Sequence, residues 1–266
     1  MSVLLEIKDL YLNFSQDAKP VEVLRGVNLK VYEGEILGLV GESGSGKTLT
    51  ALSVTKLLPK AAEIASGEIL FDGRDLLKSA EEDLRKIRGA KISYVFQDPA
   101  TSLNPVFTIG EQLIEGIELH QKVKKEESFD IAVAALKEVG MPAPKDIMYA
   151  YPHQLSGGMK QRAMIAMAIS CKPRLLIADE PTTALDVTIQ AQILDLLVHL
   201  KEELQLTIIL ITHDLSIVAQ VAEKTAVMQE GQVVEYGDTA IIYRKPSHPY
   251  TQRLIDCIPK MSGHRI

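Results

Sequence analysis

The chain has 266 residues, of which 46% are hydrophobic and 24% charged, and its formal net charge is −6 at pH 7. This size predicts a substantial core in one large domain or two small ones, and the acidic balance disfavours a dedicated nucleic-acid binder. The two cysteines, Cys171 and Cys257, lie far apart in sequence, so neither a disulfide framework nor a CxxC metal pair is expected, and a reducing cytosol is the natural setting.

The N-terminal part of the chain predicts a β-rich layer. Residues 3–40 alternate in polarity and are interrupted by turn-forming residues at 17–20 and 33–34. Residues 1–6 lack the basic start and long apolar stretch of a signal peptide, and no apolar run approaches the ~18 residues that cross a bilayer. We therefore expect the chain to serve any membrane from the surface of a partner.

A phosphate-binding loop is predicted between a buried strand and a helix. Residues 36–40 form a short apolar run, and residues 41–48 fit G-x-x-x-x-G-K-[ST] at every fixed position. Glycines let successive N–H groups converge on an anion, Lys47 adds a charge for the β- and γ-phosphates, and the Thr48 hydroxyl can ligate Mg²⁺. The nucleotide-binding residues predicted here are Gly41, Ser43, Gly44, Ser45, Gly46, Lys47, Thr48 and Thr50.

The flanks of this loop decide between a functional motif and a glycine-rich turn with a chance lysine. A strand before it and a helix after it favour the motif, because the helix N-terminus then points at the phosphate. Leu49, Leu52 and Leu57 predict an apolar stripe on that helix, which Pro59 would end.

The remaining chain alternates between strands and helices. The predicted strands are residues 67–73 (with an Asp-Gly turn at the end), 92–96, 175–178 and 207–212. The predicted helices are residues 79–88, several segments within 99–148, one after Gly158, and one whose apolar residues recur at three- and four-residue steps over 189–204. Gly140 is expected to stop a helix whose apolar face carries Ile131, Leu136 and Val139, and the charges at 122–127 indicate a solvated surface. This alternation predicts a largely parallel α/β sheet with a helical insertion.

Two carboxylates follow the strand predicted at 175–178. Asp179 and Glu180 lie at its C-terminal tip, where open α/β sheets bind ligands. Asp179 can hold Mg²⁺ directly or through water, and Glu180 can polarise an attacking water as a general base or positioning group. The alternative is that the pair caps the next helix.

Residues 155–162, Leu-Ser-Gly-Gly-Met-Lys-Gln-Arg, predict a second helix N-terminus suited to an anion, because a serine and two glycines open the helix. Two such sites far apart in sequence favour a dimer in which the second site serves another subunit's nucleotide. A plain helix N-cap is the alternative.

Together these segments resemble the ATP-binding cassette (ABC) ATPases. The motifs GESGSGKT, LSGGMKQR, LLIADEPTTALD and ITHD carry the resemblance, which covers essentially the whole chain. It implies a P-loop NTPase (RecA-like) α/β core with an N-terminal antiparallel β-subdomain and an inserted helical subdomain, which binds ATP and Mg²⁺ and hydrolyses ATP. The expected core is residues 1–97 and 158–245, the helical subdomain 98–157, and a short C-terminal tail 246–266.

The resemblance also implies catalytic and metal-site roles. Gln97 corresponds to the glutamine that senses Mg²⁺ and the attacking water and faces the transmembrane partner. The expected metal-site residues are therefore Thr48, Gln97 and Asp179. His213 would hold the γ-phosphate and order Glu180, so the expected catalytic residues are Glu180, His213 and Gln97.

Further roles concern the second subunit and the adenine base. The residues expected to contact the γ-phosphate held by the opposite protomer are Ser156, Gly157 and Gly158, and Asp186 would lie at the dimer interface. Phe14 is the expected adenine-stacking aromatic, with Tyr11 as the competing candidate, and each is also a candidate core residue.

A narrower resemblance points to the dipeptide/oligopeptide/nickel importer branch. It is carried by FQDP at 96–99, SLNP at 102–105, YPHQ at 151–154 and SHPYT at 247–251. Many members of this branch continue into a tail with several cysteines that ligate an iron–sulfur cluster. Only Cys257 lies in this region here, so we expect a short form without the cluster, and nickel or metal chelates stay open beside peptides as the solute.

The expected function is the ATP-hydrolysing subunit of an importer at the cytoplasmic face of the cell membrane. Its expected partners are a second ABC ATPase (a heterodimer is favoured over a homodimer), two permease subunits and, through the complex, an extracellular solute-binding protein, with no nucleic acid. Three alternatives are disfavoured: a soluble DNA-repair ABC protein by the lack of a coiled coil, an exporter by the lack of a transmembrane run, and a dead-site subunit by the intact Lys47, Glu180 and His213.

Residues 97–105 predict a shaped, exposed loop, because Pro99 and Pro105 fix the backbone and remove N–H donors. In the resembling importers a short cytoplasmic helix of the permease docks beside this loop. Phe107 is therefore expected either on that docking surface or in the core.

Overall fold

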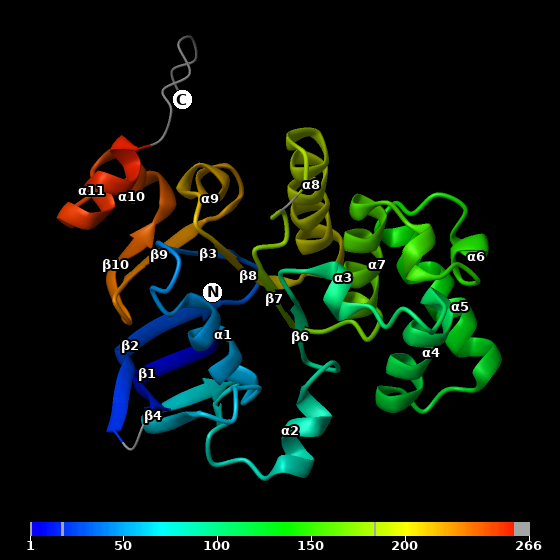
Figure 1. The fold of residues 1–266 in the computed structure, drawn as a ribbon, viewed down its shortest axis with the longest axis horizontal. Helices are drawn as coiled ribbons and strands as arrows, with labels where there is room; N and C mark the ends of the chain where they lie inside the picture. The colour runs from blue at the N-terminus through cyan, green and yellow to red at the C-terminus, as the bar shows by residue number, and fades with distance from the viewer. Residues whose placement is uncertain (1, 17–18, 184, 258–266) are drawn as a thin grey trace. The chain divides into compact units, whose positions relative to one another are not determined.

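The computed structural model describes residues 2–16, 19–183 and 185–257, and the chain divides into two compact units. The first unit comprises Met1–Leu77 and Leu210–Ile266, and the second Lys78–Ile209 (Figure 1). Strand β8 (Thr207–Thr212) passes from the second unit into the first. The predicted α/β class is confirmed, whereas the subdomain limits expected from the sequence stay a prediction.

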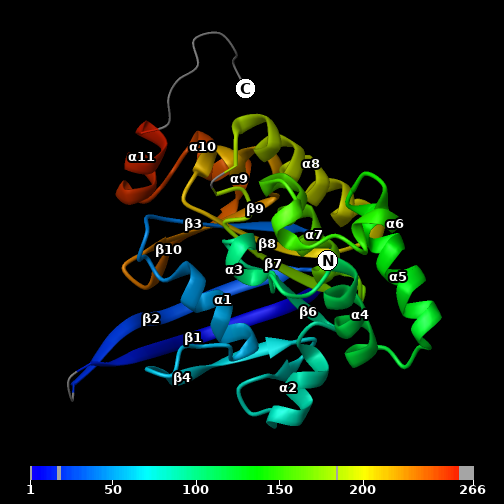
Figure 2. The ribbon, with the colours of Figure 1, turned by 45° about the vertical axis from the view of Figure 1, so that its right-hand side comes forward.

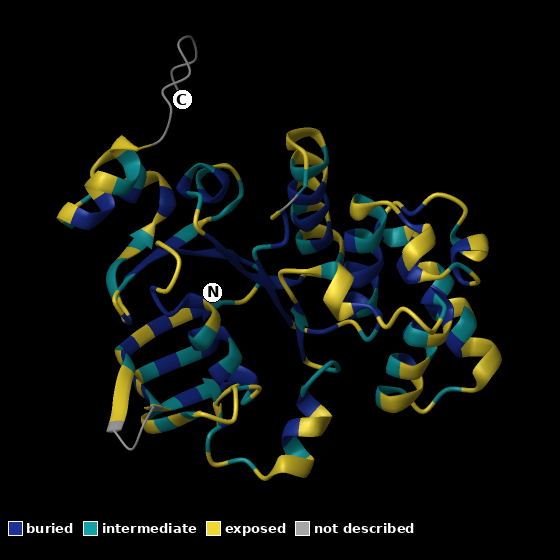
Figure 3. Cartoon of the chain, in the orientation of Figure 1, coloured by how far each residue is buried: buried dark blue, intermediate teal, exposed yellow. Residues whose placement is uncertain are grey.

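An antiparallel sheet of order β2-β1-β4-β5 lies in the first unit. Its strands are β1 (Val3–Gln16), β2 (Lys19–Tyr32), β4 (Ala62–Phe71) and β5 (Arg74–Asp75). Buried and more exposed residues alternate along these strands, which Figure 3 shows as bands of colour. The predicted β-rich layer and the turn at 72–73 are confirmed. Pro20, expected in a turn, instead lies on the edge strand β2 and pairs with Ser15 of β1. An edge strand tolerates the missing N–H of proline. Residues 17 and 18 of the predicted turn lie outside the described residues.

The first unit also holds the β10-β9-β3-β8 part of a second sheet. Its strands here are β3 (Ile36–Val40), β9 (Lys224–Gln229) and β10 (Gln232–Asp238), and β3 runs parallel to β9. Every residue of β3 and β8 is buried, as a continuous apolar run requires, and both predicted ranges are confirmed. The helices of this unit are α1 (Lys47–Thr55), α9 (Leu215–Val221), α10 (Thr239–Arg244) and α11 (Pro249–Asp256).

Helix α1 packs differently from its prediction. It ends at Thr55 rather than at Pro59, because Lys56 adopts a left-handed backbone (φ 52) and its N–H bonds back into the last turn. The buried residues of this helix are Lys47, Thr50, Ala51, Ser53, Val54 and Thr55. The predicted apolar stripe was therefore wrong, and its members, which are half-buried or exposed, are Leu49, Leu52 and Leu57.

The second unit holds the β8-β7-β6 part of the sheet and most of the helices. Strands β6 (Ile92–Val95) and β7 (Leu175–Asp179) pair in parallel. The helices are α2 (Glu81–Ile87), α3 (Pro99–Ser102), α4 (Ile109–His120), α5 (Lys125–Glu138), α6 (Pro144–Ile147), a 3₁₀ turn (Pro152–Gln154), α7 (Gly157–Ile169) and α8 (Val187–Leu204). Within this unit α4, α5, α6 and α7 cluster together, in green in Figure 2. Gly140, with φ 66, follows the end of α5 as predicted.

Helix α4 illustrates how the sequence builds these helices. Thr108 and Glu111 form a capping box, in which the Thr108 hydroxyl accepts from the Glu111 N–H at 3.2 Å and the Glu111 carboxylate accepts from the Thr108 N–H at 2.7 Å. These bonds from the Thr108 N–H and hydroxyl hold the pKa of Glu111 below its usual value. Ile109, Leu113 and Ile117, four residues apart, form the buried face. Across the described part of the chain, no helix combines the length and the apolarity needed to cross a membrane.

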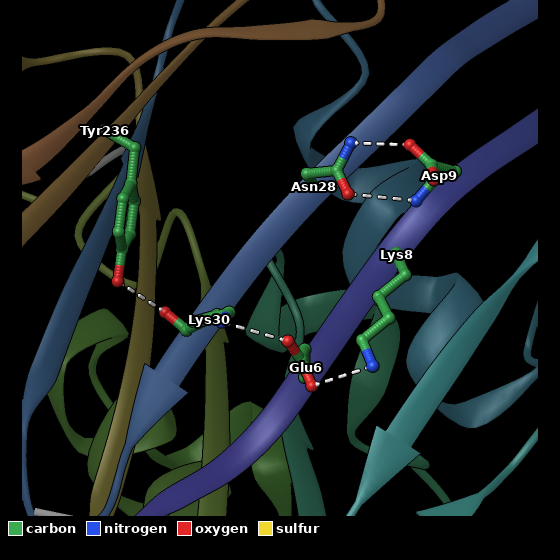
Figure 4. Close-up of polar contacts among 6 residues, drawn as sticks. All are labelled: Glu6, Lys8, Asp9, Asn28, Lys30 and Tyr236. Atoms are coloured by element: carbon green, nitrogen blue, oxygen red, sulfur yellow. Dashed lines mark hydrogen bonds and ion pairs between the residues drawn. The ribbon is translucent and has the colours of Figure 1, made fainter.

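Polar contacts join strands of the antiparallel sheet to one another and to β10 (Figure 4). The Tyr236 hydroxyl on β10 donates to the backbone carbonyl of Lys30 on β2 at 2.9 Å. The Lys30 ammonium lies 3.1 Å from the Glu6 carboxylate on β1 and holds the pKa of Glu6 below its usual value. Asn28 on β2 bonds to both the N–H and the carboxylate of Asp9, where β1 bulges. Such exposed pairs add little stability, so we infer that they mainly fix register.

We predict that Gly67→Ala lowers the free energy of unfolding by about 2–4 kcal/mol, the combined scale of backbone strain and overpacking. Gly67 on β4 has φ 116, and a Cβ built there would lie 2.7 Å from the Asp9 carbonyl oxygen and from Leu10 Cα. Gly34→Ala is the matched control, because Gly34 also has a positive φ (74) but its Cβ would meet nothing within 4 Å. Calorimetric unfolding of both variants checks this, and equal losses would contradict it.

Candidate functional site

The phosphate loop, residues 41–48, joins β3 to α1, so the predicted order of strand, loop and helix is confirmed. Gly41 has φ 155, and a Cβ built on it would lie 2.2 Å from the carbonyl oxygen of Met228 on β9. Gly46 has φ 103, and a Cβ there would lie 2.7 Å from the Leu24 side chain. The main chain leaves no room for a side chain at Gly41, and the positive φ at Gly46 favours glycine, so the loop keeps the tight curl in which successive N–H groups can converge on an anion.

Lys47 lies across the start of this loop. Its side chain is buried, and its ammonium donates to the carbonyl oxygens of Gly41 and Glu42 at 2.8 Å each. The Thr50 hydroxyl, which is also buried, donates to the Gly46 carbonyl at 2.9 Å and so supports the loop from the first turns of α1. Of the other predicted loop residues, those that are exposed are Ser43, Gly44 and Thr48, and Ser45 is buried.

Asp179 is the last residue of β7 and is only 4% exposed. Its carboxylate accepts a 2.7 Å hydrogen bond from the hydroxyl of Tyr94, on the parallel neighbour β6. Burial and the adjacent Asp179 carboxylate raise the pKa of the Tyr94 hydroxyl, so the tyrosine stays a neutral donor. Sequence reasoning missed Tyr94, because a tyrosine inside a short apolar strand is indistinguishable from a core residue.

Glu180 follows Asp179 with a left-handed backbone (φ 44), a conformation that is strained for a residue with a side chain. Its carboxylate accepts from the Gln97 amide at 3.0 Å and from the Thr183 hydroxyl at 2.8 Å. The structure thus brings together two of the three predicted catalytic residues, since Gln97 follows the end of β6. It also adds Thr183, which sequence reasoning did not single out.

The next helix, α8, has its own cap. Asp186 is the N-cap, and its carboxylate accepts from the Ile189 N–H at 2.9 Å. The alternative that Asp179 and Glu180 cap this helix is therefore wrong. Asp186 itself is exposed at the start of α8.

Ser156 opens helix α7 as predicted. Its hydroxyl accepts from the Met159 N–H at 3.3 Å, so the capping interaction is present. Gly157 begins the helix, and a Cβ built on Gly158 would lie 2.9 Å from the Ile189 side chain of α8. The cap and a role in anion binding are compatible, because a hydroxyl can accept and donate at once.

The remaining predicted site residues lie in the first unit. His213 is exposed and directly follows β8. Phe14 is half-buried and Tyr11 is 36% exposed, so neither is a fully buried core residue. A Cβ built on Gly26 would lie 2.9 Å from the Tyr11 hydroxyl, which places the Tyr11 side chain over its own hairpin.

The segment that follows Gln97 is only partly the loop that was predicted. Pro99 begins the one-turn helix α3, because proline presets the helical φ and the Asp98 carboxylate caps the turn by accepting from Ala100 N–H at 2.8 Å. Further along, the Gln112 amide donates to the Phe107 carbonyl at 3.1 Å and holds the loop. The Phe107 side chain is 46% exposed, so the alternative that it lies in the core is wrong.

Comparisons with known proteins show which family the chain resembles. A family model described as "ABC transporter" matches residues 24–183, and one described as "Oligopeptide/dipeptide transporter, C-terminal region" matches residues 234–266. The dipeptide transport ATP-binding protein DppD of Escherichia coli is 46% identical over 97% of this chain and 79% of its own length. The oligopeptide transport ATP-binding protein OppD of Bacillus subtilis is 48% identical over 98% of this chain and 73% of its own length.

A solved structure supports the same relationship. The dimeric post-hydrolysis state of the ATP-binding cassette MJ0796, bound to ADP and Pi, matches with a TM-score of 0.79 and 29% identity, covering 88% of this chain and 98% of that one. Similarity extends from the phosphate loop through the carboxylates after β7, and the chain therefore belongs to the ABC transporter family as an ATP-hydrolysing subunit.

Proposed function

We propose that the phosphate loop of this chain binds ATP and that Glu180 activates the attacking water, to power the uptake of peptides through a membrane permease. The contact between Gln97 and Glu180 carries this proposal, because it joins the residues expected to sense and to activate that water. The contact also favours an active subunit over a regulatory subunit with a dead site.

The first unit supplies the groups that bind the nucleotide. The N–H groups of the loop and the Lys47 ammonium bind the phosphates of ATP. When Lys47 turns to a phosphate, its ammonium exchanges neutral carbonyl acceptors for an anionic acceptor, which binds a cation more strongly. Thr50 acts indirectly, through Gly46. Phe14 stacks on adenine, which is supported by the position of Tyr11 over Gly26, and His213 holds the γ-phosphate.

The donor set fits Mg²⁺, which prefers hydroxyl, carboxylate and amide oxygens. Thr48, Gln97 and Asp179 would hold the ion, which supplies Lewis-acid polarisation of the phosphoryl oxygens when bound. Tyr94 orients the Asp179 carboxylate, and the Gln97 N–H orients Glu180. Glu180, fixed in a strained backbone, accepts the proton of the attacking water.

A second ABC ATPase subunit completes each nucleotide site. The residues that face it are Ser156, Gly157, Gly158 and Asp186. The Ser156 hydroxyl and the N-terminus of α7 offer donors to the γ-phosphate of the partner's nucleotide. The native pair is a heterodimer with a similar ATPase rather than a homodimer.

The rest of the complex lies in and across the membrane. The helical subdomain, residues 98–157, faces two permease subunits from the cytoplasmic side, while the core, residues 1–97 and 158–245, holds the nucleotide and residues 246–266 form the tail. An extracellular solute-binding protein delivers the solute. Peptides are favoured because DppD and OppD are named for dipeptide and oligopeptide transport, and those names give no support to nickel or metal chelates.

Glu180→Gln should keep ATP binding and lower ATP turnover of the assembled transporter by ~10²–10⁴-fold, the scale of a lost general base. Glutamine keeps the size of the side chain and an oxygen for the Gln97 and Thr183 bonds, so the local geometry should persist. Steady-state phosphate release measures the loss. Wild-type turnover would rule out this role for Glu180, whereas Lys47→Ala should instead weaken nucleotide binding itself.

Ser156→Arg should leave nucleotide binding to the isolated chain within about twofold of wild type, because Ser156 lies outside the chain's own phosphate loop. ATP-driven association with the partner ATPase should fail, since a bulky cation occupies the space of the γ-phosphate contact. Light scattering in the Glu180→Gln background reports association. An ATP-induced dimer that survives the substitution would contradict the shared site.

Phe107→Asp should abolish permease capture, because losing an anchor that is buried in an interface costs about 2 kcal/mol of binding free energy or more. The melting temperature should stay unchanged, because Phe107 is exposed in this chain. Leu119→Asp is the matched control, since Leu119 is 76% exposed on α4 and lies outside residues 97–107. Pull-down of the permease with both variants decides the matter. Undiminished capture by Phe107→Asp would remove Phe107 from the docking surface.

A further inference from the structure

The side chain of Tyr250 connects helix α11 to the phosphate loop. Tyr250, in the first turn of α11, is 3% exposed and packs in a cluster of buried residues that includes Val40, the last residue before the loop. The Tyr250 hydroxyl oxygen accepts a hydrogen bond from the backbone N–H of Glu42 at 2.9 Å. Glu42 is the second residue of the phosphate loop, so the tail contacts the site over a separation of 208 residues.

The bond from Tyr250 lies beside the carbonyl groups that Lys47 holds. The Glu42 carbonyl and the Gly41 carbonyl both accept from Lys47, while the Glu42 N–H is held by Tyr250. A Lys47 that turns to a phosphate releases both carbonyls. Tyr250 then remains as a fixed support at the start of the loop.

The tail is itself anchored at a defined point. The Glu235 carboxylate on β10 accepts from the N–H and the hydroxyl of Ser247 at 2.8 Å each and from the His248 N–H at 3.2 Å. Burial raises the pKa of Glu235, but these donors outweigh it and hold the pKa below its usual value. The next N–H, that of Tyr250, donates to His248 Nδ1 at the N-cap of α11. A continuous set of polar contacts thus leads from β10 through Tyr250 to the loop.

A side chain that only filled the core at position 250 would not need a hydroxyl that bonds to the loop. Phenylalanine would fill the same volume among Val40, Leu215 and Val218, and it would leave no buried hydroxyl to satisfy. The hydroxyl instead accepts from the main chain of the loop. A part-buried N–H that loses its acceptor is costly until it reaches water, so removing the hydroxyl should let the start of the loop leave this position.

We propose that Tyr250 is a positioning residue that holds the phosphate loop in its nucleotide-binding shape through the Glu42 N–H, and that α11 thereby sets the affinity for nucleotide. The inference rests on the proposed function, in which the loop binds ATP. Because the contact does not involve the γ-phosphate, it affects ATP and ADP by the same factor.

Tyr250→Phe tests the proposal on the full chain. We expect ATP and ADP to bind about 5–30-fold more weakly by titration calorimetry, on the scale of a part-buried N–H left without its acceptor. Amide hydrogen exchange at Glu42 should be faster, and the melting temperature without nucleotide should stay near wild type because the ring is kept. In the assembled transporter the KM for ATP should rise with kcat retained.

Tyr243→Phe is the matched control, because Tyr243, on α10, packs against the same cluster. The Tyr243→Phe protein should bind nucleotide normally. Affinity within twofold of wild type for Tyr250→Phe, or equal losses in both variants, would overturn the proposal. Lys47→Ala separates the two hypotheses. If Lys47→Ala binds ATP normally, the proposed phosphate site fails; if it binds weakly and Tyr250→Phe binds normally, only the role of Tyr250 fails.

Discussion

Burial along the strands forces the polar chemistry of this protein to the strand ends. Strands β3, β7 and β8 are buried at every residue, and an unpaired charge within them would carry a large desolvation cost. The groups proposed to carry the function therefore appear where each strand stops: the phosphate loop after β3, Gln97 after β6, Glu180 after β7 and His213 after β8. Asp179 differs, because it is buried at the last position of β7. The hydrogen bond from the Tyr94 hydroxyl offsets part of the cost of burying its carboxylate.

The surrounding packing holds the proposed site residues at these strand ends in unusual backbone conformations. Glu180 keeps a left-handed backbone, and its carboxylate has two side-chain donors, Gln97 and Thr183. Gly41 is pressed against the Met228 carbonyl and leaves no room for a Cβ. Both features cost stability locally and are maintained by the surrounding packing, which is typical of sites that must be preorganised.

The sequence predicted continuous patterns well and contacts between distant residues poorly. Strands β3 and β8 were predicted with their correct limits, because an apolar run of five or six residues is too short for a typical helix and fits a buried strand. The end of α1 was predicted wrongly, because it depends on the left-handed Lys56 and not on Pro59. The bonds from Tyr94 to Asp179 and from Glu42 to Tyr250 join residues 85 and 208 positions apart, and no local pattern indicates such a partner.

The caps of α7 and α8 show how one local motif can have two chemical outcomes. Ser156 and Asp186 both accept from a backbone N–H in the first turn of their helix, at 3.3 and 2.9 Å. The serine hydroxyl keeps a proton to donate while it accepts, so Ser156 suits an anion such as a phosphate. An ionised carboxylate only accepts, so Asp186 suits a donor on the neighbouring protein surface and would repel a phosphate. The residue type at each cap therefore separates the position expected to meet nucleotide from the one expected to meet protein.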